Sequence, residues 1–348
     1  MKSFYDYSIE ELRENLISNG YSKYTSDQLF DWVYRKKELN PNNMSNIKKE
    51  LREYLKANIS FKLPDVVKKE VSKDGTVKLL LSLEDSSCVE CVLMHHPYGT
   101  SLCVTSEVGC NMGCAFCASG LIKKKRSLKA SEMVMQLLKM EEVSGEKVSH
   151  VVVMGIGEPL DNLDEVLKFI KIINYKIGLE IGIRHITVST CGIVPKIYEL
   201  AERNIPLNLA ISLHAPNNEL RNKLMPINKA YPLEVLIKAV DDYFKITGRR
   251  LTFEYLLLKD VNDTLECAIE LSDLIRGLNA YVNLIPYNTV KEFDFKTSTE
   301  AQTKLFYDKL KKEVINVTLR KKMGDDISAA CGQLRSQNYK REVKWYEN

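Results

Sequence analysis

Three cysteines, Cys110, Cys114 and Cys117, lie close together in a segment that also contains Gly109 and Gly113. Thiolates at this spacing can bind three irons of a [4Fe-4S] cubane, and the glycines let the backbone curl closely around the sulfur atoms. The fourth iron then lacks a cysteine ligand and is open to a small molecule. The spacing therefore predicts a reactive iron–sulfur site in preference to three buried, unreactive thiols.

A zinc site is an alternative that uses a different set of cysteines. Cys88 and Cys91 could join Cys114 and Cys117 as four thiolate ligands of one zinc ion. Residues three apart in a strand point to opposite faces, so Cys88 and Cys91 chelate poorly together if their segment is a strand. The zinc interpretation also leaves Cys110 without a role. A non-catalytic, zinc-containing RNA-binding module therefore stands as a remote alternative.

Polar residues end several apolar runs further along the chain. The turn Gly155-Ile156-Gly157-Glu158-Pro159 has two glycines of a dinucleotide-binding fingerprint, but it lacks the third, and its proline differs from a helix-opening phosphate loop. Later runs end in Ser189, in Ser212-Leu213-His214 and in Asn288. Each alone is more often a cap or a turn residue. Together they occupy the positions at which a parallel sheet binds its ligand.

A further thiol, Cys331, lies near the end of the chain among small residues and beside Gly332. A loop of this composition can move and bring its thiol to two different partners, whereas a core cysteine gains nothing from an adjacent glycine. Without other context, an incidental cysteine is an equally good interpretation.

The elements that must position these residues alternate between apolar strands and amphipathic helices. Strands are expected at 101–105, 150–154, 185–189, 207–213, 251–258 and 280–285, and helices at 131–143, 163–173, 194–203, 233–246, 264–275 and 300–312. Six β/α units predict a parallel sheet with right-handed crossovers. The fold class is therefore α/β, either doubly wound or a partial (β/α)6 barrel, with its ligand at the carboxyl ends of the strands.

The first 95 residues have a different pattern. Short amphipathic helices are expected first, followed by a hairpin and a third strand at 66–72, 76–83 and 88–94. We therefore expect three parts in the chain: a small helical and β accessory domain at 1–95, an α/β core at 96–335 and a basic tail at 336–348.

Composition excludes several classes of protein. The chain of 348 residues is 45% hydrophobic, enough for a sizeable core, and it has neither a long apolar run nor a signal-peptide pattern. Its nine cysteines suit metal or redox chemistry in a reducing compartment better than structural disulfides. We therefore expect a cytoplasmic protein with no membrane partner. The net charge of +4 is mild, although local basic runs are compatible with a polyanionic partner.

Seven stretches of the chain together resemble one family. They are TSLCVTSEVGCNMGCAFCASG, MGIGEPLDN, TVSTCGIVP, AISLHAPN, LMPIN, NLIPYN and GDDISAACGQL. They closely resemble the RlmN/Cfr family of radical S-adenosylmethionine (SAM) enzymes, and in particular the RlmN-type methyltransferases of adenine carbon 2 in ribosomal and transfer RNA. The resemblance is dense over residues 90–334, and it implies the partial (β/α)6 barrel of radical SAM enzymes.

This resemblance implies roles for the residues named above. Cys110, Cys114 and Cys117 would bind the [4Fe-4S] cluster, whose open iron chelates SAM. The carboxylate of Glu158 would hold the methionyl amino group. The whole SAM pocket would be lined by Phe116, Gly157, Glu158, Ser189, Ser212, Leu213, His214 and Asn288.

The resemblance also implies a route through two protein thiols that consumes two SAM molecules per turnover. One SAM methylates Cys331, and reductive cleavage of the second yields a 5′-deoxyadenosyl radical that takes hydrogen from the S-methyl group. The resulting carbon radical adds to the adenine and links the RNA to the protein. Glu90, an acid in an otherwise apolar strand where burial would raise its pKa, would remove the ring proton. Cys103 would release the product through a transient disulfide with Cys331.

The implied partners are RNA and an electron carrier. The substrates would be 23S ribosomal RNA at the peptidyl-transferase centre and transfer RNA, with the target adenine unstacked to reach the barrel. An external donor such as flavodoxin would reduce the cluster, and we expect a monomer. Cfr-type relatives, which methylate carbon 8 and confer antibiotic resistance, are the nearer alternative. The sequences GEPL at 157–160 and LIPYN at 284–288 favour carbon 2.

Overall fold

The computed structural model describes residues 1–329 and 332–334 of the chain. Short runs rich in β-branched and other apolar residues form its parallel strands. These are β6 (Gly99–Cys103), β9 (His150–Val153), β10 (Ile186–Thr190), β11 (Asn208–Ser212), β12 (Leu251–Leu257) and β13 (Ala280–Pro286). They pair side by side in this order, so the expected parallel α/β fold is confirmed.

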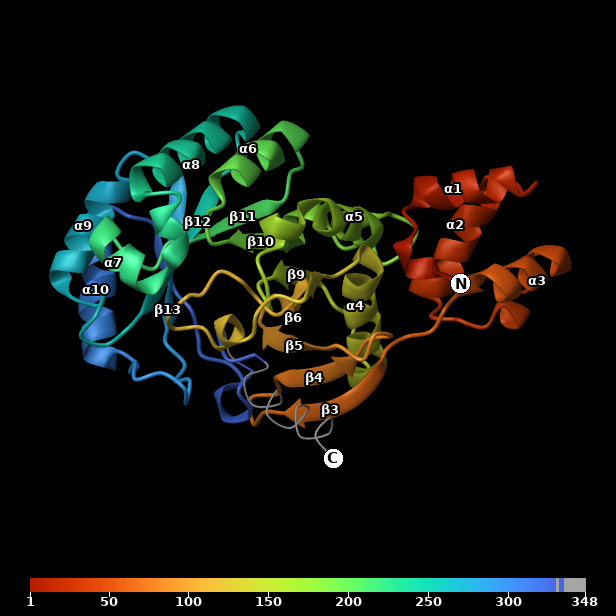
Figure 1. Ribbon diagram of the computed structural model, residues 1–348, viewed down its shortest axis with the longest axis horizontal. Coiled ribbons are helices and arrows are strands. Elements are labelled where there is room, and N and C mark those ends of the chain that lie inside the picture. The colour runs from red at the N-terminus through yellow and green to blue at the C-terminus, as the bar shows by residue number, and fades with distance from the viewer. Residues whose placement is uncertain (330–331, 335–348) are drawn as a thin grey trace.

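Helices in the connections cover the outer face of this curved sheet (Figure 1). Each is amphipathic; α5, for example, buries Val166, Phe169, Ile170 and Ile173 along one stripe. The helices are α4 (Ala130–Ser144), α5 (Leu163–Asn174), α6 (Val194–Arg203), α7 (Asn218–Leu224), α8 (Leu233–Thr247), α9 (Leu265–Ile275) and α10 (Glu300–Lys312). No helix in the described part of the chain is long and apolar enough to cross a membrane.

The sheet extends past the six expected strands at both edges. At one edge β14 (Val317–Leu319) pairs with β13 in parallel; it is too short for its pattern to be read from the sequence. At the other edge β5 (Cys88–His96), β4 (Val77–Ser82) and β3 (Asp65–Val71) add in antiparallel order to β6. Strand β5 is buried on both faces, which requires cover on both sides of the sheet. Residues 65–96, grouped above with the N-terminal helices, therefore continue the core sheet.

The N-terminal helices form a separate lobe beside α4 and α5 (Figure 1). They are α1 (Ile9–Ser18), α2 (Tyr24–Phe30) and α3 (Lys49–Asn58). The two-residue strand β1 (Lys2–Ser3), before α1, pairs in parallel with β2 (Ile59–Ser60), which follows α3. Ser8 and Glu11 form a capping box at the start of α1. Ion pairs such as Lys168 with Glu11 (2.8 Å) connect this lobe to the core.

Candidate functional site

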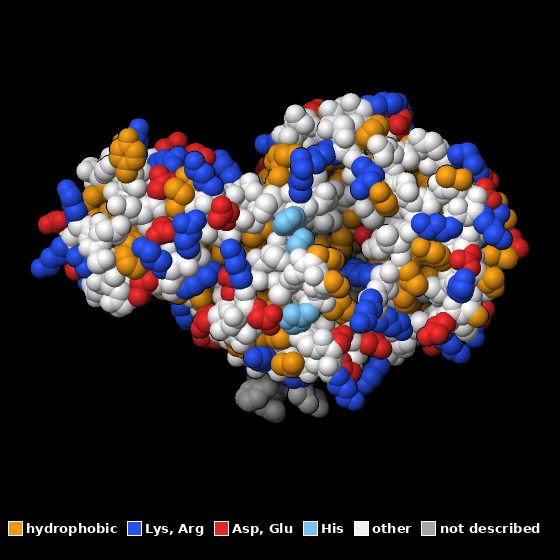
Figure 2. All heavy atoms as spheres, turned by 180° about the vertical axis from the view of Figure 1, so that it is seen from behind, with side chains coloured by type: hydrophobic (Ala, Val, Ile, Leu, Met, Phe, Trp, Pro, Cys, Tyr) orange, Lys and Arg blue, Asp and Glu red, His pale blue; other side chains and the backbone are white. Residues whose placement is uncertain are grey.

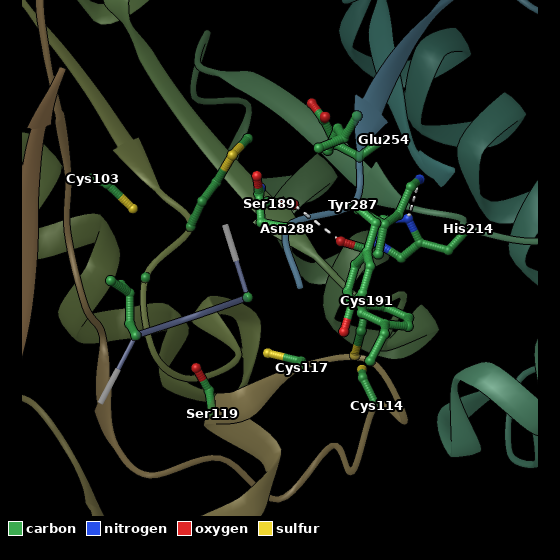
Figure 3. Close-up of a pocket in the computed structure, with 18 of the residues that line it drawn as sticks. Cys103, Cys114, Cys117, Ser119, Ser189, Cys191, His214, Glu254, Tyr287 and Asn288 are labelled. Carbon is green, nitrogen blue, oxygen red and sulfur yellow. Dashed lines mark hydrogen bonds between the residues drawn. The ribbon is translucent and has the colours of Figure 1, made fainter. Parts of the chain in front are cut away.

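A pocket lies at the carboxyl ends of the parallel strands, where ligands of such sheets bind. Its walls come from the loop after β6, the turn after β9 and the ends of β10, β11 and β13. Figure 3 shows Cys103 on one side of this pocket and His214 on the other, with Ser189 and Asn288 between them. Residues distant in the sequence therefore meet because parallel strands end at the same edge of the sheet.

The loop with three cysteines folds back so that its first residues contact residues 122–127. The backbone N–H of Cys110 donates to the carbonyl of Ile122 (2.8 Å), and β7 (Glu107–Val108) pairs with β8 (Arg126–Ser127) to close the loop. Gly109 has a φ of +80°, and a Cβ there would lie 2.2 Å from the carbonyl oxygen of Lys123. Only glycine fits this close approach of two backbones.

All three thiols of the loop, those of Cys110, Cys114 and Cys117, line the pocket. Burial raises the pKa of Cys114 well above its ordinary value, and the neighbouring Cys117 and Cys110 raise it further. Among the described residues, no three His, Cys, Asp or Glu side chains are close enough to hold a single metal ion. In a cubane each thiolate binds a different iron, so the ligands lie further apart than around one ion. Three soft sulfur donors around one cavity fit a [4Fe-4S] cluster.

The cysteines of the zinc alternative do not converge. In the register of β4 and β5, Cys91 lies opposite Leu79 and packs with it in the main core, where burial raises the pKa of its thiol. Cys88, three residues earlier, is on the opposite face of the strand. Neither residue lines the pocket that contains Cys114 and Cys117. The arrangement therefore gives the four-thiolate zinc site no support.

Glu158 is 3% exposed at the end of the turn after β9, and it lines the pocket. One carboxylate oxygen accepts the backbone N–H of Leu160 (3.0 Å), and the other accepts that of Cys191 (2.8 Å). Burial raises the pKa of this carboxyl, and the N–H donors oppose the rise. These bonds lock the side chain in one orientation, with further lone pairs for a positively charged ligand group.

The backbone around Glu158 is itself held by a buried acid that sequence patterns did not single out. Glu107, fully buried, accepts the backbone N–H of Glu158 (3.1 Å) and pairs with the ammonium of Lys124 (2.6 Å). Gly157 has a φ of +107°, and a Cβ there would lie 2.5 Å from Cγ of Glu107. Gly157 thus lines the pocket and leaves room for the acid beneath it.

His214 follows β11 in a left-handed conformation with φ of +55°. Its Nδ1 accepts the backbone N–H of Leu256 (3.0 Å), and its ring forms a T-shaped pair with that of Phe116, with the centroids 4.9 Å apart. Burial lowers the pKa of His214 to about 3, and the charge of Arg221 contributes to the shift. The imidazole is therefore neutral with its proton on Nε2, a hydrogen-bond donor in the pocket wall.

The other residues expected at the cofactor site divide into two groups. Ser189 and Ser212 line the pocket with their hydroxyl oxygens 3.4 Å apart, and Asn288 lines it from the end of β13. The side-chain oxygen of Asn288 is buried with no hydrogen-bond partner among the described atoms, as expected of a group that a ligand would satisfy. Leu213, by contrast, points its side chain into the hydrophobic core and can contribute only its backbone.

Arg221 of α7 supports the pocket from behind, although nothing in its sequence context indicated this. It is fully buried, and its guanidinium donates to the carbonyls of Cys191 (2.8 Å), Leu213 (3.2 Å) and Ser212 (3.3 Å) and to the side chain of Asn228 (2.9 Å). Burial lowers its pKa to about 10. One planar cation therefore ties together three segments that surround the pocket.

The register of β4, β5 and β6 places the two other expected catalytic residues on one face of the sheet. Cys103 lies opposite Val92, and Glu90 is two residues before Val92 on the same face. Glu90 is 1% exposed. Met94, on this face too, lines the pocket with Cys103, whereas Glu90 lies outside its immediate lining.

The end of the described chain returns to the cysteine loop. The backbone N–H of Ala118 donates to the carbonyl of Gly332 (2.8 Å), and the side chain of Gln333 donates to the carbonyl of Thr289 (2.9 Å). Cys331 itself lies outside the described residues. No disulfide joins two of the described cysteines, so the transient Cys103–Cys331 disulfide stays a prediction.

Basic side chains reach the pocket from the segment after β14. Arg320, Lys321 and Lys322 are among its lining residues. On the face seen in Figure 2, Lys and Arg side chains are spread among acidic ones and several border a central hollow. The basic groups are therefore distributed, with one cluster of three at the pocket.

The fold and this site define a radical SAM enzyme: a partial parallel barrel with three cysteines at the carboxyl ends of its strands. A model of the radical SAM superfamily matches residues 105–271, and a model of the ribosomal RNA large subunit methyltransferase N-terminal domain matches residues 3–60. Both a [4Fe-4S] cluster and SAM are implied by this superfamily.

Individual relatives narrow the assignment. The chain is 51% identical over 334 residues to a probable dual-specificity RNA methyltransferase RlmN of Acholeplasma laidlawii, covering 96% of this chain and 99% of the relative. It is 49% identical to the protein of the same description from Geobacillus kaustophilus, covering 99% and 95%. A solved radical SAM methyltransferase from Sphaerobacter thermophilus superposes with a TM-score of 0.91 at 39% identity, covering 97% and 100%. The chain belongs to the RlmN family of dual-specificity RNA methyltransferases.

Proposed function

We propose that this enzyme methylates carbon 2 of a specific adenine in 23S ribosomal RNA and in transfer RNA, with Cys331 as the carrier of the new carbon. The observation that carries the proposal is the bond from Ala118 to Gly332, which brings the residue after Cys331 against the cysteine loop. The names of the relatives, which describe dual-specificity RNA methyltransferases, support RNA as the substrate.

The first half of the reaction loads the protein. The sulfur of Cys331 takes a methyl group from one SAM, and S-adenosylhomocysteine and a proton leave. The pocket residues suited to bind SAM are the neutral Nε2–H of His214, the unpartnered oxygen of Asn288 and the carboxylate of Glu158. Phe116 offers a ring face or edge for a flat base.

The second half joins the carbon to RNA. Cys110, Cys114 and Cys117 would hold the cluster beside a second SAM. One-electron cleavage of that SAM would supply the chemistry that removes a hydrogen atom from the methyl group. The remaining methylene carbon bonds to carbon 2 of the adenine. Glu90 takes the proton from that carbon, and one electron returns to the carrier that began the cycle.

Release then needs a second thiol. The thiolate of Cys103 attacks the sulfur of Cys331, an S–S bond forms, and the S–CH2 bond breaks with its electron pair on carbon. That carbon takes a proton and becomes the methyl group. An external dithiol reductant must afterwards restore both cysteines.

The partners follow from this chemistry. An external one-electron donor such as flavodoxin would reduce the cluster, and Arg320, Lys321 and Lys322 would contact RNA phosphates at the pocket. Residues 3–60, which match the N-terminal domain model, would help to dock RNA. We propose that the protein works in the cytoplasm as a monomer.

Anaerobic reconstitution tests the proposal. The enzyme is loaded with iron, sulfide and methyl-labelled SAM, incubated with protein-free 23S ribosomal RNA or transfer RNA, and the nucleosides are analysed by mass spectrometry. We expect label on adenine carbon 2 in both RNAs and a methyl group on Cys331 in the intact protein. Cys331→Ala should lose both signals, whereas Cys267→Ala, on the outer helix α9, should keep them. Label on carbon 8 would instead establish the Cfr-type reaction.

A further inference from the structure

The segment before Cys331 is held by the turn between β3 and β4. The carboxylate of Asp74 accepts the backbone N–H of Gly324 (2.9 Å). Asp326 accepts the hydroxyl of Ser72 and the backbone N–H of Lys73 (3.2 Å). These contacts join parts of the chain about 250 residues apart, and Figure 1 shows the C-terminal segment beside this hairpin.

Lys78 of β4 contacts the segment before Cys331 from the interior of the protein. Its side chain is 5% exposed, and its ammonium donates to the carbonyls of Ile327 (2.8 Å) and Ser328 (3.3 Å). It also lies 3.0 Å from the carboxylate of Glu70 and 3.9 Å from that of Glu90. One buried cation thus contacts both the segment before Cys331 and the residue suited to remove the ring proton.

The charges around Lys78 alternate along one face of the sheet. Lys68 pairs with Glu70 (2.6 Å), Glu70 with Lys78, and Lys78 faces Glu90. Hydrogen bonds from Lys68 and Lys78 outweigh the effect of burial and hold the pKa of Glu70 below its usual value. The thiols of Cys88 on β5, two residues before Glu90, and of Cys103 on β6 are further titratable groups on this face in the described part of the chain.

The donors of the Lys78 ammonium are all in use. An ammonium has three N–H groups, and these serve Glu70, Ile327 and Ser328. At 3.9 Å, Lys78 stabilises a charge on Glu90 without forming a hydrogen bond to that oxygen. If the segment left, two donors would be released and could bond to Glu90, making its carboxylate a weaker base.

We propose that Lys78 is a positioning residue that couples docking of residues 324–329 to the readiness of Glu90 to accept a proton. The inference rests on the proposed function, in which Glu90 is the base and Cys331 the carbon carrier. The docked segment occupies two donors of Lys78, whose nearby charge favours the ionised form of the buried Glu90 carboxylate without a hydrogen bond to it. Glu90 is therefore the stronger base when residues 324–329 are docked.

Hydrogen–deuterium exchange on the full chain tests the docking half. Loss of a charged hydrogen bond should speed exchange of the amides of 324–329 by about tenfold in Lys78→Met. Lys78→Arg, which keeps the charge and the donors, should restore slow exchange. Lys68→Met is the matched control, because Lys68 contacts Glu70 but not the loop, and it should exchange as the wild type does.

Infrared spectroscopy tests the half that concerns Glu90. At neutral pH, Lys78→Met should show a protonated-carboxyl band that is missing from the wild type and from Lys78→Arg. The band should vanish in the double variant Lys78→Met/Glu90→Gln. A melting curve establishes that each variant is folded, and Lys78→Gln replaces Lys78→Met if the latter fails to fold.

The outcomes separate this inference from the proposed function. Both measurements use protein without RNA, so they report on Lys78 whether or not the RNA reaction is as proposed. Unchanged exchange in Lys78→Met, or no carboxyl band assignable to Glu90, would overturn the coupling. Absence of methyl on wild-type Cys331 after reaction with SAM would overturn the proposed function instead.

Discussion

The backbone N–H of Leu256 donates a hydrogen bond to Nδ1 of His214 at 3.0 Å. This bond places the imidazole proton on Nε2, and burial lowers the pKa of the ring to about 3. A histidine held neutral in this way cannot bring a positive charge to a pocket suited to a sulfonium ligand. The same bond has a consequence for stability.

Because of His214, the free energy of unfolding should decrease as the pH is lowered. Its pKa in the unfolded chain is about 6.5, so the unfolded state binds a proton more readily than the folded state, and stability is lost as pH falls below that value. Between pH 7 and pH 5 the loss should be about 2 kcal/mol. Urea unfolding at the two pH values measures it. His214→Gln should remove this part of the slope, and exposed His185→Gln should keep it.

Replacing Gly157 should destabilise the fold strongly. Its φ of +107° is strained for any other residue, and a Cβ would lie 2.5 Å from the buried Glu107. Gly157→Ala should lower the free energy of unfolding by about 3 kcal/mol. Gly248→Ala provides the comparison, because Gly248 has φ of +64° but nothing within 4 Å of its Cβ position. That change should cost about 1 kcal/mol, and equal losses in the two variants would contradict the close contact at Gly157.

Arg221 should not tolerate even a conservative change. Lysine keeps a charge but cannot reproduce the fork that reaches the carbonyls of Cys191, Leu213 and Ser212. Arg221→Lys should lower the free energy of unfolding by about 3 kcal/mol in chemical denaturation, because buried carbonyls lose their donors. Exposed Arg276→Lys should change it by less than about 0.5 kcal/mol.

Iron content should depend on three cysteines of the nine. After anaerobic reconstitution, single alanine variants of Cys110, Cys114 and Cys117 should bind little iron and lose the visible absorption of an iron–sulfur cluster. Cys267→Ala should bind as much iron as the wild type. Zinc without iron or sulfide in the wild-type protein would refute the cluster assignment.

The sequence by itself determined the order of the six central parallel strands, six of the helices that follow them, and the identity of the cysteine loop. The helices α6 (Val194–Arg203) and α10 (Glu300–Lys312) have the predicted bounds, because long amphipathic runs with clear ends carry their own local signal. The motif around Cys110 was equally readable, since its residues are neighbours in the chain.

The tertiary structure alone decided which side chains meet across the sheet. The β3–β4 hairpin looked like part of an N-terminal domain, because a strand pattern does not specify its partner. Pairing of β4 with β5, and of β5 with β6, made the hairpin an edge of the core sheet. Leu213 was expected at the cofactor with His214, yet adjacent residues point in different directions, and its side chain faces the core. Glu107, Arg221 and Lys78 carry ordinary charges in ordinary sequence contexts. Their importance comes from burial and from partners far along the chain, and only folding creates those.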